Sequence, residues 1–328
     1  MNKDFYTIKK QEQYVIDHVL EELVEKYGDI KNYCFLENAS YYATKLPFEI
    51  WDTLNKFKYR EDNCGLVIIR GYEFKKNEIG DTPSTIASAS KKNLLQKKIE
   101  FFLALCSSIL GDLFSWNTQQ NGKILNDIIP LKESAYEQLG TSSKTELKWH
   151  IEEAFHEHRP DYVGLMCLKN PDDVATLYSN IRNISLNNEQ KDLLFQEKFM
   201  FEMDLNFSNS NYNTNKPVSI LFGNYDEPYV RIDPAFMKKT GYSPEIDHSV
   251  NVALDLIEKN IKEIILKPGD ICFFDNYRTV HGRAPFDAKF DGNDRWLKRV
   301  LITRDLRKSS EFKNTNRSRV IHTDVVSK

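Results

Sequence analysis

The sequence lacks a long apolar run, an excess of basic residues and paired cysteines, and each absence excludes a class of protein. No apolar run in its 328 residues approaches the ~18 residues of a membrane-spanning helix. The first residues, MNKDFYTIKKQEQY, contain no apolar stretch after their positive charges, so we expect no secretory signal. Lysine and arginine number 45 against 48 aspartate and glutamate residues, a balance that predicts no nucleic-acid surface.

The five cysteines form no closely spaced metal-binding motif, and no glycine-rich phosphate loop is present either. Cys106 falls in an apolar helical run, and Cys167 and Cys272 fall in apolar strand-like runs, so we expect small buried side chains there. An odd cysteine count without a secretory signal is typical of a reducing compartment, and we therefore predict a cytoplasmic protein.

The spacing of apolar residues changes near residue 111, from mainly helical before it to mainly strand-like after it. Apolar residues recur at helical spacing in five segments, which are 10–27, 48–57, 92–110, 186–195 and 248–260. One strand-like run, 64–72, lies in the first part. Strand-sized runs separated by turn residues, ELKWHIEEAF and FMFEMDL among them, fill most of the second part. This pattern predicts a mainly β fold with flanking helices, a sandwich or barrel rather than a parallel α/β sheet.

A candidate metal site lies in WHIEEAF, where His150 and Glu152 are two residues apart. On a strand, residues two apart point to the same side of the sheet. Two histidines and one carboxylate on one face, with open positions opposite, are typical of iron sites that activate oxygen. The best third ligand is His281, which begins a strand-like run in LKPGDICFFDNYRTVHGRAPF after a Pro-Gly-Asp turn and an apolar run.

Other interpretations of the histidines stay open on the residues alone. His150 and Glu152 could be surface residues of a strand, because H-x-E arises readily by chance. His156 and His158 are also two apart in FHEHRP and could hold zinc instead. We interpret the remaining histidines as structural or solvated, namely His18, His248 and His322.

Two arginines follow in NDRWLKRVLITRD, at Arg295 and Arg299. On a strand these two positions share one face. A planar guanidinium binds a carboxylate with two parallel hydrogen bonds, so this face predicts a site for two carboxylates. The alternative is that both arginines are solvated on an outer strand.

In order, spacing and flanking residues, the chain from about Trp116 to Thr303 resembles the clavaminate-synthase-like oxygenases that depend on iron(II) and 2-oxoglutarate. It is most similar to the branch that hydroxylates free amino acids such as lysine, arginine and asparagine. The matching segments are TQQNGKILNDIIP, LKWHIEEAFHEHRPDYVGLMCLKNP, VATLYS, VSILFGNYDEPYVRIDP, LKPGDICFFDNYRTVHGRAPF and RWLKR. Glutamate is usual as the carboxylate ligand of this branch, and related halogenases lack that carboxylate, so Glu152 implies hydroxylation.

The resemblance implies a double-stranded β-helix, a distorted jelly roll, with helices packed outside. We expect one oxygenase domain over 1–328, with a mainly helical support over 1–111 and a core over 112–305. The polar, asparagine-rich segment 206–217 lies where relatives have a lid, and 306–328 forms a C-terminal tail.

The resemblance also implies a set of cofactors. Fe(II) would be held by His150, Glu152 and His281, with 2-oxoglutarate and dioxygen as cosubstrates. Arg295 would bind the distal carboxylate of 2-oxoglutarate, and Thr176 in VATLYS would assist it.

Substrate residues follow from the same resemblance. Arg299 matches the residue that pairs with the substrate α-carboxylate. Gln119 matches a polar group near the α-amino end, with Gln120 as a one-residue alternative in register, and Glu152 can contact the α-amino group. Asp233 in YVRID matches an acidic position that recognises cationic side chains, although it could also be a turn residue before a proline.

The sequence predicts that the substrate is a free cationic L-amino acid, with L-lysine first and oxidation at C3 or C4. Arginine-hydroxylating relatives have a second acidic residue two positions after the one that Asp233 matches, and here that position is Ala235. A single carboxylate suits a compact ammonium better than a broad guanidinium. Arginine, ornithine or a neutral amino acid is the alternative substrate, and a non-catalytic jelly-roll binding protein is the alternative function. We expect no nucleic-acid or membrane partner, and the sequence does not fix the oligomeric state.

Overall fold

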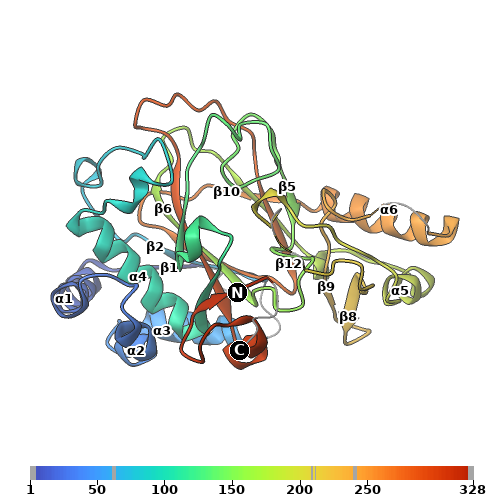
Figure 1. Ribbon diagram of the computed structural model, residues 1–328, viewed down its shortest axis with the longest axis horizontal. Coiled ribbons are helices and arrows are strands. Elements are labelled where there is room, and N and C mark those ends of the chain that lie inside the picture. Colours follow the sequence, from blue (N-terminus) through green and yellow to red (C-terminus); the bar gives the residue numbers. More distant parts are fainter. Residues whose placement is uncertain (1–4, 61–63, 208–209, 211, 239–241, 324–328) are drawn as a thin grey trace.

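The structure is a computed structural model that describes residues 5–60, 64–207, 210, 212–238 and 242–323. Helices cover two opposite sides of a central β core, as Figure 1 shows. On one side lie α1 (Lys10–Tyr27), α2 (Tyr33–Ala43), α3 (Phe48–Tyr59) and α4 (Leu94–Leu110), and on the other lie α5 (Asn188–Leu194) and α6 (Pro244–Lys259). None of the helices in the described part of the chain combines the length and apolar composition needed to cross a bilayer.

The larger of two main sheets runs in the order β1-β2-β11-β6-β13-β3-β14, and β4 pairs with β13 outside this path. Its strands are β1 (Phe5–Thr7), β2 (Leu66–Arg70), β3 (Asp112–Trp116), β4 (Leu125–Ile128), β6 (Tyr162–Lys169), β11 (Ile271–Asp275), β13 (Trp296–Thr303) and β14 (Val320–Ile321). Most of its pairs are antiparallel, while β1–β2 and β3–β14 are parallel. This mixed sheet with helices outside agrees with the fold class that the sequence predicts.

The smaller sheet has the order β10-β7-β12-β5 and is antiparallel throughout. Its strands are β5 (Leu147–His150), β7 (Thr176–Asn180), β10 (Lys262–Ile264) and β12 (Thr279–Arg283). A separate hairpin pairs β8 (Leu221–Gly223) with β9 (Pro228–Val230). Side chains of the smaller sheet and its following turn contact side chains from the β13 region, so the two main sheets face each other.

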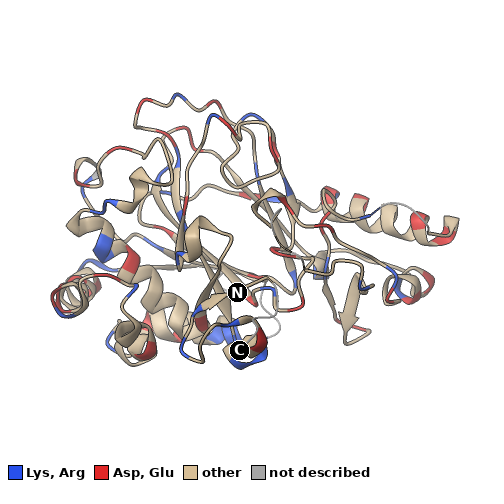
Figure 2. Ribbon diagram, viewed as in Figure 1, with Lys and Arg blue, Asp and Glu red and all other residues tan. Residues whose placement is uncertain are grey.

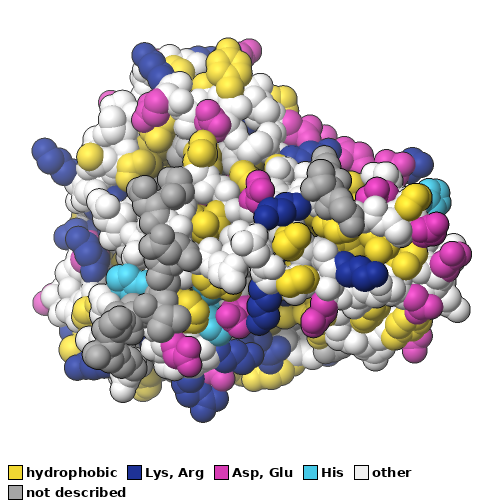
Figure 3. Space-filling view, turned by 45° about the vertical axis from the view of Figure 1, so that its right-hand side comes forward, with side chains coloured by type: hydrophobic (Ala, Val, Ile, Leu, Met, Phe, Trp, Pro, Cys, Tyr) yellow, Lys and Arg dark blue, Asp and Glu magenta, His cyan; other side chains and the backbone are white. Residues whose placement is uncertain are grey.

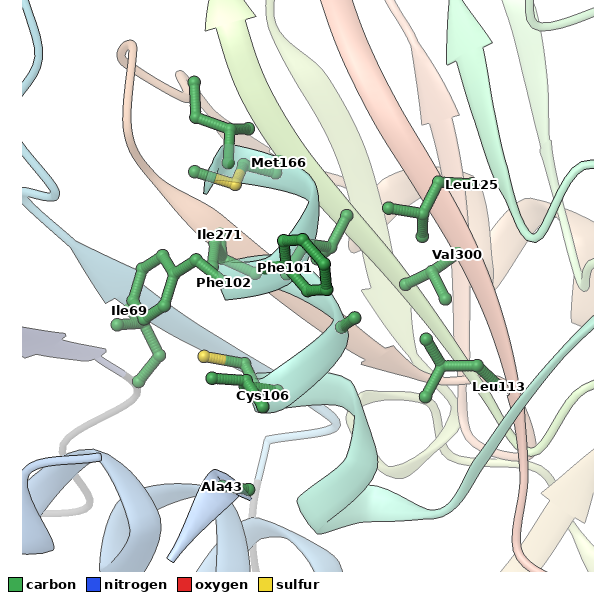
Figure 4. Packing of buried hydrophobic residues seen from close by; sticks show 14 of the residues in the cluster. Ala43, Ile69, Phe101, Phe102, Cys106, Leu113, Leu125, Met166, Ile271 and Val300 are labelled. Carbon is green, nitrogen blue, oxygen red and sulfur yellow. The ribbon is translucent and has the colours of Figure 1, made fainter. Parts of the chain in front are cut away.

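The helical side packs on the outer face of the larger sheet. Phe101 and Phe102 of α4 are fully buried in one apolar cluster with Met166 of β6, Ile271 of β11 and Val300 of β13 (Figure 4). Along β6 and β13 alternate apolar side chains enter this cluster, with the buried, ion-paired Lys298 in the same row on β13, while the residues between them point to the opposite face. The outer face therefore stabilises the sheet, and the inner face is left for a pocket.

Several helix predictions agree closely with the structure. Segment 10–27 is α1, 48–57 forms most of α3, and 92–110 contains α4. The later patterns are present with shifted starts. Helix α6 begins at Pro244, because proline at the first turn and two acidic residues nearby suit a helix N-terminus. Helix α2 was not predicted, although Asn32 caps it by accepting a hydrogen bond from Cys34 N at 3.0 Å.

Two strand predictions are wrong. The run ELKWHIEEAF forms a strand only up to His150, and Glu152 lies in the turn after it. Glu153 in this turn has a φ of 57°, in the left-handed region, so the alternation of a strand cannot continue through it. The run FMFEMDL makes only isolated bridges, at Phe199 and Phe201.

Charged residues of both signs are distributed over the helices and loops (Figure 2). On the face drawn in Figure 3, basic and acidic side chains lie interspersed with apolar ones. The cysteines Cys106, Cys167 and Cys272 are buried, as the sequence predicts.

Candidate active site

The side chains of His150, Glu152 and His281 converge at one end of the smaller sheet. His150 and His281 are paired residues of β5 and β12, and Glu152 follows β5 in the turn. Glu152 Oε2 lies 3.5 Å from His150 Nε2 and 3.4 Å from His281 Nε2. Among the described residues, these three form the one group of histidine, cysteine and acidic side chains that could hold a metal ion, with ligand atoms within 4.8 Å of one another.

The close approach of β5 and β12 depends on a glycine beside the metal group. A Cβ at Gly282 would lie 2.6 Å from the carbonyl oxygen of Leu147, closer than real Cβ atoms come to another atom. Glycine at this position therefore lets the two strands bring His150 and His281 together, with ring centroids 4.9 Å apart.

Neighbouring groups orient each of the three side chains. His150 Nδ1 donates to the carbonyl oxygen of Lys148 at 2.8 Å, which leaves Nε2 facing Glu152. The ring of His281 stacks on Phe274, with centroids 5.0 Å apart. The fully buried Asn276 accepts from Glu152 N at 2.8 Å and donates to the carbonyl oxygens of Glu152 at 3.0 Å and Pro160 at 2.9 Å. This amide fixes the turn that carries Glu152.

The local charges favour an ionised carboxylate. Burial alone would raise the pKa of Glu152, but Arg299 and the two imidazoles hold it well below the usual range. Burial disfavours the charged form of His150, yet Glu152 and Asp233 together raise its pKa to about 9. Burial lowers the pKa of His281. Two imidazole nitrogens and one carboxylate oxygen, the donor set found here, fit ferrous iron.

Arg299 on β13 is bonded directly to this group. Its Nη1 donates to Glu152 Oε1, and its Nη2 donates to Gln119 Oε1 at 2.8 Å and to Asn126 Oδ1 at 3.2 Å. Gln119 in turn donates to Glu153 Oε1 at 2.5 Å.

Gln119 and Gln120, the two alternatives that the sequence offers for the substrate site, have different partners. Gln120 instead pairs with the backbone of Asp127, accepting at 3.0 Å and donating at 2.8 Å. Of the two, Gln119 is therefore the residue that meets Arg299.

A second arginine group lies in the same pocket. Arg295 is 5% exposed and donates to Thr176 Oγ1 at 3.3 Å, while its Nε is buried with no partner in the described part of the chain. Burial lowers the pKa of Arg295 to about 10. Arg283 of β12 lines the pocket beside these residues, and burial together with the charge of Arg295 lowers its pKa to about 9.

Acidic side chains line a further part of the pocket wall. They are Glu152, Glu153, Glu202, Asp204 and Asp233. Burial raises the pKa of Asp233, and it raises the pKa of Asp204 to about 6. Ala235 lines the same wall.

The sequence analysis selected Asp233 and Glu152 as candidates but missed the other three acidic residues, Glu153, Glu202 and Asp204. Glu153 stands next to a candidate ligand, and Asp204 stands just before the asparagine-rich segment. Either position could have been used to predict an acidic residue of the site. Asn126, which bonds Arg299, carried no such signal.

The segment 206–217 packs partly against the site. Phe207 is fully buried against Trp116 and Phe155, and the ring of Tyr212 stacks on His156 with centroids 4.1 Å apart. Residues 208, 209 and 211 of the predicted lid lie outside the described residues. The prediction that this segment closes over substrate stays a prediction.

The zinc alternative finds no support in the geometry. His156 is enclosed by aromatic rings, its Nδ1 accepts from His158 N at 2.9 Å, and burial lowers its pKa to about 3. Within the described part of the chain, the His156–His158 pair belongs to no group suited to a metal ion.

Residues 96–301 match the model of the family "Taurine catabolism dioxygenase TauD, TfdA family". The chain is 35% identical to an enduracididine beta-hydroxylase of Streptomyces hygroscopicus, over 94% of this chain and 96% of that protein. It is 34% identical to an L-ornithine/L-arginine 3-hydroxylase of Catenulispora acidiphila, over 95% and 98% of the two chains. An L-lysine 4-hydroxylase of Flavobacterium johnsoniae is 29% identical, over 86% and 78%.

Among solved structures, the non-heme iron oxygenase OrfP in complex with Fe and alpha-ketoglutaric acid superposes with a TM-score of 0.91 at 34% identity. The match covers 97% of this chain and 99% of that one. Iron(II), 2-oxoglutarate and dioxygen are accordingly the cofactor and cosubstrates of the protein. The chain belongs to the TauD/TfdA family and is an iron(II)- and 2-oxoglutarate-dependent dioxygenase of the amino acid hydroxylase type.

Proposed function

We propose that the protein hydroxylates an unactivated side-chain carbon of a free L-amino acid with a cationic side chain, and that the carbon is C3. The observation that carries the proposal is one pocket that contains a cation beside the metal group for an α-carboxylate, Arg299, and acidic groups, Asp204 and Asp233, for a side-chain cation. The names of the relatives at 35% and 34% identity, a beta-hydroxylase and a 3-hydroxylase, support position C3.

His150, Glu152 and His281 would hold the iron, which supplies the activation of dioxygen when 2-oxoglutarate is oxidised. The protein's own contribution is position and exclusion of water. Asn276 fixes the turn of Glu152, and the Lys148 carbonyl fixes the ring of His150. Arg295 would bind the distal carboxylate of 2-oxoglutarate with help from Thr176, because its buried guanidinium has no carboxylate partner among the described residues.

Arg299 would bind the substrate α-carboxylate, and Gln119 and Glu152 would contact the α-amino group. All three already form one hydrogen-bonded chain with Glu153. The α-amino and α-carboxylate groups of a free amino acid suit this row of hydrogen-bonded side chains. The carboxylate can pair with Arg299, and the ammonium can pair with the two glutamates.

The sequence and the pocket favour different side-chain cations. The sequence favours L-lysine because Ala235 removes one carboxylate, and this stays a prediction. The pocket, however, is lined by Glu202 and Asp204 as well as Asp233, so it offers enough acceptors for a broad cation. We therefore rank arginine-type substrates and ornithine ahead of lysine, in line with the 35% and 34% relatives.

We also infer that the two facing sheets form a double-stranded β-helix within a single oxygenase domain. Residues 1–111 would then act as a support for the larger sheet, and 306–328 as a tail, of which 324–328 lie outside the described residues. A cytoplasmic location, and the absence of nucleic-acid and membrane partners, stay predictions from the sequence.

The test is a panel of free amino acids incubated with the protein, Fe(II), 2-oxoglutarate and air. We expect succinate release coupled to consumption of arginine, ornithine or lysine, and an NMR spectrum of the product with a new hydroxyl at C3. Citrulline serves as the neutral control for arginine, because it has the same shape without the charge. If citrulline or another neutral amino acid is consumed as fast as every cationic one, the cationic proposal is wrong.

A further inference from the structure

Arg283 occupies a position in the pocket to which neither the sequence nor the proposed function gives a role. It follows His281 by two residues on β12, so both side chains point to the same face of the smaller sheet. Its neighbours across the sheet are Thr176 of β7 and Leu147 of β5. It is 3% exposed and lines the pocket together with Arg295 and Thr176.

Among the described residues, the hydrogen-bond partners of the Arg283 guanidinium are all uncharged. It donates to Ser142 Oγ at 2.9 Å, to the carbonyl oxygen of Thr145 at 2.9 Å and to that of Ser143 at 3.4 Å. Its cationic face lies over the ring of Phe286, 5.0 Å from the centroid. The Nε atom is buried and has no hydrogen-bond partner among the residues that the structure describes.

Arg295 likewise has a buried guanidinium whose partner is uncharged. Within the described ranges, its side chain bonds to one hydroxyl, that of Thr176, and its Nε is buried without a partner. In the described part of the chain, neither guanidinium forms an ion pair with a carboxylate. Two buried cations side by side without a counter-charge are costly, unless a ligand supplies the negative charge.

We propose that Arg283 is a second cation for the distal carboxylate of the 2-oxo acid and determines the specificity for a dianionic cosubstrate. This rests on the proposed role of Arg295 and Thr176 at the same end of the pocket. A 2-oxo acid with a distal carboxylate compensates both guanidiniums. One without that carboxylate leaves them uncompensated, so the pair selects by charge as well as by length.

The loop contacts of Arg283 suggest the competing explanation, a purely structural side chain that holds residues 142–145. Glutamine at this position keeps hydrogen-bond donors for the loop but removes the charge. Lysine keeps the charge but loses the planar fork. Ser142→Ala removes one loop bond and leaves Arg283 intact, so it is the matched structural control.

The experiment measures the dissociation constants of 2-oxoglutarate and of 2-oxopentanoate by anaerobic calorimetry on the Fe(II)-loaded protein. The second compound has the same chain length and no distal carboxylate. For Arg283→Gln we expect 2-oxoglutarate to bind about ten- to a hundredfold more weakly. The constant for 2-oxopentanoate should change less than about twofold, and Arg283→Lys and Ser142→Ala should retain most of the discrimination. Equal weakening of both compounds, or of neither, overturns the proposal.

Arg295→Gln provides a second test that does not require the Arg283 variants to fold. With Arg283 still present, this variant should keep a residual preference of about threefold or more for 2-oxoglutarate over 2-oxopentanoate. Loss of all preference in Arg295→Gln contradicts the role of Arg283. Absence of any preference in the unmodified protein contradicts the role of Arg295 instead, so the two failures are distinguishable.

Discussion

The two charged parts of the pocket are built in different ways. The cationic part, Arg283 and Arg295 with Thr176, is carried by strands or by the residue that directly precedes one. The acidic part is carried mostly by turns and loops, since Glu153 lies in the turn after β5 and Asp204 and Asp233 lie outside the strands. Positions on strands are held by the hydrogen-bond ladder, whereas loop positions move and change more readily.

This difference corresponds to what each part would bind. The cosubstrate is common to the whole family, so a rigid, strand-borne cationic part suits it. The amino acid differs between relatives, and a loop-borne acidic part lets the substrate change without rebuilding the sheets. The metal group, shared by both, should be the most sensitive to substitution.

The largest effect is expected for His281→Ala, which disables both parts together. Removing one nitrogen ligand should abolish stable iron binding. Because a bound metal contributes several kcal/mol to the transition state, turnover should fall about 1,000-fold or more. Metal analysis and succinate release measure this. His248→Ala, on the exposed face of α6, is the control and should retain full iron content; iron retained in His281→Ala contradicts the ligand assignment.

Arg295→Gln should damage the cationic part alone. Losing the charge partner of a buried carboxylate is expected to raise KM for 2-oxoglutarate about 100-fold, with KM for the amino acid nearly unchanged. Steady-state kinetics with each substrate varied in turn separates the two constants. The exposed Arg304→Gln is the matched control. A parallel rise in both KM values would show that the two parts are not separable.

Asp233→Asn should damage the acidic part alone. The amide keeps an oxygen that can accept from Ala235 N and Phe236 N, so the turn survives while the charge is lost. We expect kcat/KM for cationic amino acids to fall about 10- to 100-fold, and turnover of citrulline to change little. Asp226→Asn, exposed in the β8–β9 turn, is the control. An equal loss for citrulline would assign Asp233 a structural role.

The smallest effect is expected for Asn276→Ala, which should not distinguish the two parts. Loss of its three hydrogen bonds loosens the turn of Glu152 without removing a ligand. Activity should fall about tenfold for every substrate and cosubstrate pair, with weaker iron binding. Asn251→Ala on the exposed side of α6 should have no effect. A selective loss at one part of the pocket would mean that Asn276 does more than fix the turn.

Local patterns explain what could be predicted. Helix α1 was predicted at both ends, because its apolar spacing and the glycine that follows are both local signals. The three candidate ligands were identified together, since their residue types and order are local features of two segments. Their convergence agrees with that expectation.

Local patterns also explain the errors. Period-two spacing was the argument for His150 and Glu152, yet Glu152 reaches the site from a turn with a left-handed residue beside it. The structure brings the three candidate residues together, but the strand geometry expected at Glu152 was wrong. The strand ends because β12 pairs with β5 only from Leu147 to His150, and this limit is set by the partner strand.

By itself the sequence determined the helical and strand periodicity, the candidate metal ligands and the two arginines spaced four apart at the start of β13, because each depends on residues close together in the chain. Only the tertiary structure decided that Gln119 rather than Gln120 meets Arg299, that Asp204 shares a pocket with Asp233, and that Arg283 lies beside Arg295. Those facts depend on which strands pair and which sheets face each other. Gln119 and Arg299 lie 180 residues apart in the chain, and Arg283 and Arg295 are carried by or border strands of different sheets, so no local pattern could have supplied these contacts.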